Sequence, residues 1–69
     1  MENMIVNTIE NILDESVTLQ TKVDDINAWT SLKMLQIIMA LEDEGIIIPI
    51  EKMAQIHSVS DIINIASEK

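Results

Sequence analysis

Apolar residues near the start of the chain recur every three or four positions, the spacing that places them on one face of an α-helix. The residues of this face are Ile5, Ile9, Ile12 and Leu13. Polar residues such as Asn3 and Glu10 fall outside it, so the segment is amphipathic. We therefore predict a first helix that extends to about Glu15.

The next segment, residues 16–29, loses this period and gathers Ser, Thr, Asp and Asn. Their side chains compete for local backbone hydrogen bonds, which favours irregular structure. We predict a long ordered loop, held to the core by Val17, Leu19, Val23 and Ile26. Loops of this length in compact domains are often functional, and the alternative is a long connection with no role of its own.

A second helix is predicted from Thr30 or Ser31, either of which can cap it, to Glu44. Gly45 ends it because glycine adopts a positive φ at little cost. Its apolar residues form two stripes, Met34, Ile37, Ile38 and Leu41 in the first, Leu32, Leu35 and Met39 in the second. One stripe suits the core and leaves the other as a docking surface; the alternative is a central helix packed on most sides.

After the second helix we predict a buried connector at residues 46–48 that ends at Pro49. One or two helical turns follow within residues 50–56, with Met53 and Ile56 directed inward. Ser58 and Asp61 have the spacing of a capping box. The last helix then buries Val59, Ile62, Ile63 and Ala66. Three main helices and a short one, with a long loop after the first, predict an all-α fold, a small four-helix bundle in a single domain over 1–69.

Composition narrows the class of protein. Of the 69 residues 48% are hydrophobic, with one glycine and one proline, which excludes a disordered linker. Without cysteine the chain has no disulfide, thiolate metal site or thiol nucleophile. Its apolar runs are far shorter than the roughly 18 residues of a membrane span, and no basic region precedes one near the N-terminus. We expect a monomeric cytoplasmic protein with no membrane segment.

Charge points to the kind of partner. Twelve acidic and four basic residues give a formal net charge of −8. This charge repels nucleic acid and anionic membranes and attracts basic protein surfaces. The three consecutive acids Glu42, Asp43 and Glu44 point in different directions on a helix, so we predict a solvated acidic face and no metal site.

Ser31 stands where the long loop meets the second helix. The positive end of a helix stabilises a phosphate there, so a phosphodiester on its hydroxyl is favourable. His57, the only histidine, lies beyond Pro49 and is most simply a surface or capping residue, so no base is in view to activate Ser31. Ser31 therefore suits modification by another enzyme, and its simpler interpretation is a helix cap. Trp29, the only aromatic residue, is expected to anchor the loop beside it.

Four short segments carry the most specific pattern in the chain. They are Trp-Thr-Ser-Leu at 29–32, Ile-Met-Ala-Leu-Glu-Asp-Glu at 38–44, Ile-Pro-Ile at 48–50 and Ile-His-Ser-Val-Ser-Asp-Ile-Ile at 56–63. Together, at this spacing, they resemble the acyl carrier protein family. The resemblance covers about residues 25–66, while the first helix agrees only in pattern.

The resemblance implies an acyl-carrier-protein-like four-helix bundle that is not an enzyme. Its serine, Ser31 here, receives 4′-phosphopantetheine from coenzyme A through a phosphopantetheinyl transferase and Mg²⁺. The thiol of this arm then holds an acyl or aminoacyl group as a thioester and presents it to partner enzymes, as in fatty acid, polyketide or secondary metabolite biosynthesis. By position, the family's docking face implies roles for Leu32, Leu35, Met39 and Glu42.

The chain also departs from the family. Thr30 stands where the family usually has aspartate, and Lys33 and Gln36 occupy positions that are often acidic. The loop after Glu44 lacks the usual aromatic residue and is one residue shorter, with Gly45 in its place. Two hypotheses follow: a carrier loaded on Ser31 that serves a dedicated partner, or a carrier-like interaction module without the arm. A hydrolase that uses Ser31 or His57 is a third, with no visible base or oxyanion site behind it.

Overall fold

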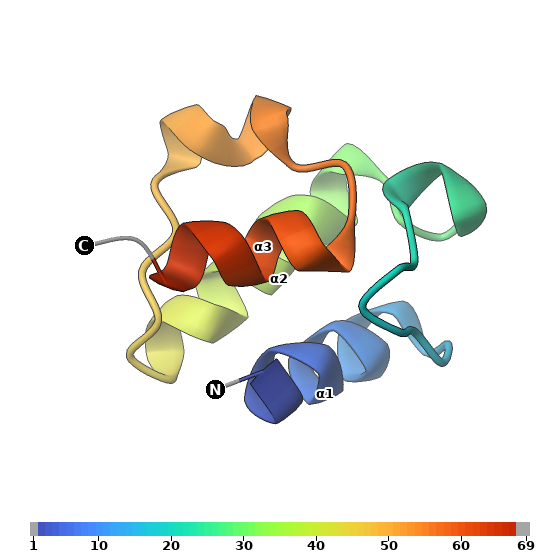
Figure 1. Ribbon diagram of the computed structural model, residues 1–69, viewed down its shortest axis with the longest axis horizontal. Helices are drawn as coiled ribbons and strands as arrows, with labels where there is room; N and C mark the ends of the chain where they lie inside the picture. The colour runs from blue at the N-terminus through green and yellow to red at the C-terminus, as the bar shows by residue number, and fades with distance from the viewer. Residues whose placement is uncertain (1, 68–69) are drawn as a thin grey trace.

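The computed structural model describes residues 2–67, which form three α-helices and two short 3₁₀ helices (Figure 1). They are α1 (Glu2–Leu13), η1 (Val23–Asp25), α2 (Ser31–Asp43), η2 (Ile50–Gln55) and α3 (Val59–Ser67). No strand occurs within residues 2–67, so the predicted all-α class is confirmed. The three predicted main helices and the short helix before the last are present, and η1 is an addition within the predicted loop. The predicted domain, 1–69, includes three terminal residues outside the described part.

The first helix ends two residues before the predicted position. Asp14 adopts a φ of 57°, the left-handed region, and its N–H still donates to the Glu10 carbonyl at 2.8 Å. Aspartate is one of the few residues that enter this region at modest cost, so it closes the helix here. Three of the four predicted core residues of this face, Ile5, Ile9 and Leu13, are buried, and Ile12 is partly buried against the core.

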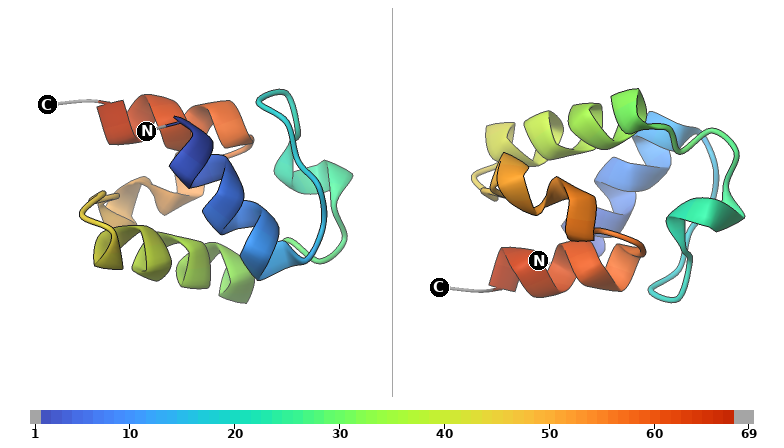
Figure 2. Two further views of the ribbon diagram at one scale, coloured as in Figure 1. Left: turned by 90° about the horizontal axis from the view of Figure 1, so that it is seen from below. Right: turned by 90° about the horizontal axis from the view of Figure 1, so that it is seen from above.

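The helices α2 and α3 form opposite sides of the structure (Figure 2). In Figure 2, α1 crosses between them on one face of the molecule, and η2 lies between them on the opposite face. The helix α1 contacts both α2 and α3. The most deeply buried side chains come from these three helices: Ile5, Ile9, Ile37, Leu41, Val59 and Ile62. Each such side chain contributes about 1.5–3 kcal/mol through burial, and together they hold α2 in place.

The two stripes of α2 separate as predicted. Its buried residues are Met34, Ile37, Ile38 and Leu41. In the second stripe Leu32 and Met39 are 64% and 59% exposed, while Leu35 is half-buried. The alternative of a helix packed on most sides is therefore wrong. The last residue of the helix is Asp43, one before the predicted end; Glu44 is the C-cap, and Gly45 follows with a φ of 89°, as its position predicts.

Backbone hydrogen bonds order the long loop against the start of α3. The N–H of Val23 donates to the His57 carbonyl at 2.9 Å, and that of Val59 donates to the Thr21 carbonyl at 3.0 Å. Val17 and Ile26 are buried and Val23 is partly buried, as predicted, but Leu19 is exposed. The prediction for Leu19 was wrong, because its side chain lies on a turn and is 37% exposed.

The connector before η2 is only partly buried. Ile48 lies in the core and Ile46 packs against it, as predicted for a buried connector, whereas Ile47 is exposed, so the prediction was wrong for Ile47. At the start of α3 the Ser58 hydroxyl accepts from the Asp61 N–H at 3.2 Å, as predicted. The Asp61 carboxylate accepts instead from the N–H of His57, at 2.8 Å, which corrects the reciprocal half of the capping box.

Candidate functional site

The start of α2 is capped by Thr30 and not by Ser31. Thr30 is extended, with φ −93° and ψ 175°, and its hydroxyl accepts from the Lys33 N–H at 3.3 Å. Ser31 is the first residue of the helix and its side chain is exposed. The interpretation of Ser31 as a simple cap is therefore wrong. Within residues 2–67 its hydroxyl has no side-chain hydrogen bond, so it is free for chemistry.

The electrostatic surroundings of Ser31 favour an anion. The first turn of α2 contains no acidic residue, and Lys33 stands two positions after the serine. The positive end of the helix stabilises a negative group by about 0.3–1 kcal/mol. Thr30 makes the capping hydrogen bond without adding a carboxylate. The first turn of α2 thus contributes no negative charge of its own to a molecule whose formal net charge is −8.

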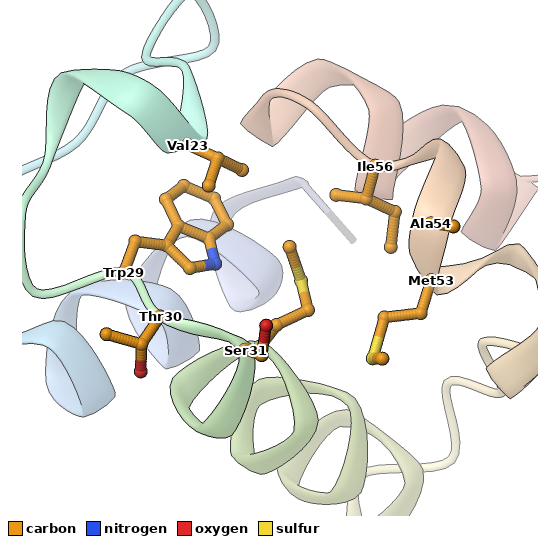
Figure 3. Close-up of a pocket in the computed structure, with 8 residues that line it drawn as sticks. Val23, Trp29, Thr30, Ser31, Met53, Ala54 and Ile56 are labelled. Atoms are coloured by element: carbon orange, nitrogen blue, oxygen red, sulfur yellow. The ribbon is translucent and has the colours of Figure 1, made fainter.

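A pocket of about 350 Å³ opens beside Ser31 (Figure 3). Its walls come from η1, the residues before α2, the first turn of α2, and η2 with the residue that follows it. The lining residues are Val23, Trp29, Thr30, Ser31, Met34, Met53, Ala54 and Ile56. Its volume lies at the lower end of the usual range for ligand pockets, about 300–1,000 Å³. The sequence pattern did not predict this pocket, because its walls come from separate elements.

The pocket lacks a residue that could activate the serine. None of its lining residues carries an ionisable side chain. His57 is exposed and is not among them. A serine hydroxyl is a weak nucleophile without an adjacent base, and the residues that line this pocket supply none.

Trp29 forms one wall of the pocket beside Ser31. Its side chain is only 4% exposed and belongs to the core, which confirms the prediction that it anchors the loop. Its indole nitrogen Nε1 is buried and has no hydrogen-bond partner. A buried tryptophan N–H usually has an acceptor, so this donor is a feature of the site that sequence reasoning missed. A lone tryptophan two positions before Ser31 was the available signal.

The four predicted docking residues lie on the outward side of α2. Leu32, Leu35, Met39 and Glu42 follow one another at intervals of three or four, which places them along one face of the helix. Leu32, Met39 and Glu42 are exposed and Leu35 is half-buried. Two further exposed apolar residues, Ile47 and Ile50, follow the helix and were not predicted as surface.

The acidic residues at the end of α2 show no arrangement for a metal. Within residues 2–67 no group of three or more His, Cys, Asp or Glu residues could hold a metal ion. Glu42, Asp43 and Glu44 are exposed, and the Glu44 carboxylate accepts from the Thr8 hydroxyl of α1 at 2.6 Å. Over the same residues, none of the helices has the length and apolar character that crossing a bilayer requires.

Comparisons of the chain with protein-family models, curated proteins and solved structures give no match. Three features of its own geometry characterise the site. These are a free serine at a helix start, an apolar pocket beside it and an exposed apolar stripe along the same helix.

Proposed function

We propose that the protein is an acyl or aminoacyl carrier with an acyl-carrier-protein-like four-helix bundle, working in the cytoplasm. Ser31 bears 4′-phosphopantetheine, and the thiol of this arm carries the cargo as a thioester. The observation that supports the proposal best is the Ser31 hydroxyl, which is exposed, released from capping and placed at the positive end of α2.

Loading requires another enzyme to reach this hydroxyl. In the proposed step the Ser31 oxygen attacks the phosphorus of coenzyme A that bears the pantetheine, and the adenosine bisphosphate leaves while the serine proton passes to the transferase. Because Ser31 is exposed, another enzyme can reach its hydroxyl, and the helix start stabilises the phosphodiester that results. The pocket contains no base of its own, which supports a carrier that depends on external enzymes over a hydrolase.

The outward face of α2 supports the docking of a partner enzyme next to the loaded serine. It places Leu32, Leu35 and Met39 in a row that ends at Glu42. Apolar side chains of this kind supply binding energy when covered, and acids at the edge steer basic partners. We propose a basic partner surface for the transferase and for the enzymes that load and process the cargo.

The test is intact mass spectrometry after incubation with coenzyme A, Mg²⁺ and a transferase of broad specificity. We expect the mass to increase by one phosphopantetheine in the wild type and in Ser16→Ala, a change at another exposed serine. Ser31→Ala should show no increase. An unmodified wild type, or a Ser31→Ala protein that still gains the mass, would contradict the proposal.

A second candidate is a carrier-like interaction module that bears no arm. Thr30 favours it, because this position lacks the carboxylate of the family and retains only the capping hydroxyl. Aspartate caps helices as well as threonine does, so Thr30→Asp should keep the fold and restore the carboxylate. If only Thr30→Asp is loaded, the module without the arm is favoured; if the wild type is loaded fully, Thr30 is tolerated and the carrier stands.

A further inference from the structure

The indole N–H of Trp29 is the one buried side-chain nitrogen or oxygen in residues 2–67 that lacks a hydrogen-bond partner. Burying such a donor unpaired costs about 1–3 kcal/mol. The Trp29 side chain is also 4% exposed, so solvent does not compensate for the missing partner. An uncompensated donor of this kind suggests a ligand that supplies the acceptor.

The position of this donor connects it to Ser31. Figure 3 shows the indole nitrogen on the edge of the ring that faces the pocket, with the Ser31 hydroxyl directed toward the same pocket. The nitrogen exposes less than 1 Å², so an acceptor reaches it only when a neighbouring side chain moves. Two of the lining residues, Met34 and Met53, are methionines, whose unbranched side chains change conformation easily.

We propose that Trp29 is a specificity-determining residue, whose indole N–H donates to a carbonyl oxygen of the chain attached to Ser31. The apolar part of that chain lies among Val23, Met53 and Ile56. This inference rests on the proposed function, because the arm on Ser31 is what brings the carbonyl to the pocket. The acceptor is an amide or thioester carbonyl on a flexible chain. It has two possible sources, which are the amides of the arm and the carbonyl of the cargo.

The pairing gives the pocket a preference that apolar walls alone lack. A chain with a carbonyl at the right place satisfies the buried donor, whereas a plain hydrocarbon chain leaves it unpaired. One such hydrogen bond corresponds to about a tenfold difference in pocket occupancy. The pocket therefore favours a carbonyl-bearing chain over a saturated one of equal length.

The absence of native cysteine allows a test that needs no transferase. Ser31→Cys introduces a unique thiol, which exchanges with the disulfide of pantetheine to form a mixed disulfide and release one pantetheine. A matched protein receives an alkyl thiol of similar length by the same exchange. Because Trp29 is the only tryptophan, ¹⁵N-labelled protein gives a single indole N–H signal.

We expect the indole proton to shift downfield in the pantetheine-linked protein and its exchange with solvent to slow about tenfold. The alkyl-linked protein should show neither change. Ala54→Leu, which fills the pocket from an exposed position on η2, should abolish the shift while circular dichroism reports an unchanged fold. An unmoved indole signal in the pantetheine-linked protein, equal shifts with both chains, or a shift that survives Ala54→Leu would overturn the inference.

Enzymatic loading of the wild type distinguishes the two sources of the carbonyl. A shift with the free-thiol arm identifies an arm amide, and a shift that appears only after acylation identifies the cargo. The same samples separate the two proposals. If mass spectrometry shows no loading but the pantetheine-linked variant shifts, the carrier function fails and the pocket stands. If loading occurs and no linked or loaded form shifts, the pocket fails and the carrier stands.

Discussion

The two faces of α2 are made of the same kinds of residue and have opposite surroundings. Ile37 and Ile38 face inward and are buried in the core, while Leu32 and Met39 face outward and are mostly exposed. Hydrophobicity alone does not distinguish them, since both faces contain leucine or isoleucine and methionine. The difference indicates that stability resides on the inner face and that the outer face is available for a partner.

The largest effect is expected from cutting the inner face. Ile37→Ala removes a fully buried side chain and should lower the free energy of unfolding by about 2–5 kcal/mol. Met39→Ala, at an exposed position of the same helix, should change it by no more than about 0.5 kcal/mol. Urea unfolding measures both. Equal losses in the two variants would remove the distinction between the faces.

The next effect concerns the outer face and the transferase. The double variant Leu32→Ala and Met39→Ala should lower kcat/KM for phosphopantetheine transfer about tenfold, because a few anchoring side chains carry most of the binding energy of an interface. Its urea midpoint should remain close to that of the wild type. Leu19→Ala, an exposed residue on the loop, serves as the control and should leave transfer unchanged. An unimpaired double variant would show that partners bind elsewhere.

Gly45→Ala tests whether the positive φ of Gly45 ends α2, and with it the inner and outer faces of the helix. No atom lies within 4 Å of the position of the added methyl group, so the cost comes only from the φ of 89°. We expect a loss of about 1–2 kcal/mol in unfolding free energy. Asp43→Ala, which lies inside the helix and is exposed, is the matched control with an expected change near zero. A Gly45→Ala protein as stable as the wild type would show that the end of α2 does not depend on glycine at this position.

Thr30→Ala tests the opposite end of the helix and should cost about 1 kcal/mol through the lost bond to the Lys33 N–H. Ser31→Ala should cost less than about 0.5 kcal/mol, because Ser31 lies within the helix and its side chain is exposed. Thermal unfolding of the two variants compares adjacent hydroxyls directly. The reverse order would reassign the cap to Ser31 and weaken its proposed availability for loading.

The smallest effect is expected from screening. A formal net charge of −8 makes the acidic surface repel itself, so moderate salt or millimolar Mg²⁺ should raise the melting temperature. We expect a rise of a few degrees, equivalent to less than about 1 kcal/mol. Glu42→Gln, which removes one exposed charge, should flatten this dependence slightly. A melting temperature that does not move with salt would contradict the explanation.

Several features could be predicted because their causes are local. Gly45 ends α2 since glycine enters the left-handed region at little cost, and the spacing of Met34, Ile37, Ile38 and Leu41 identifies the inner stripe. The predicted end of α1 was two residues late. Asp14 adopts the left-handed conformation that ends the helix, but aspartate favours it less than glycine does, so the residue type gives a weaker signal. A pattern shows which residues are apolar, but not which element covers them, so the exposure of Leu19 and Ile47 was missed.

The sequence by itself determined the three main helices, the two stripes of α2 and the position of Ser31 at a helix start, because these depend on periodicity and on near neighbours in the chain. The tertiary structure decided that Thr30 caps and leaves Ser31 free, that a pocket lies beside it, and that the Trp29 N–H is buried there without a partner. The walls of the pocket come from η1, α2, η2 and residues next to them, which are separate in the sequence and meet only in the folded chain. Burial and hydrogen-bond pairing are properties of that packing, so they emerge only in the folded chain.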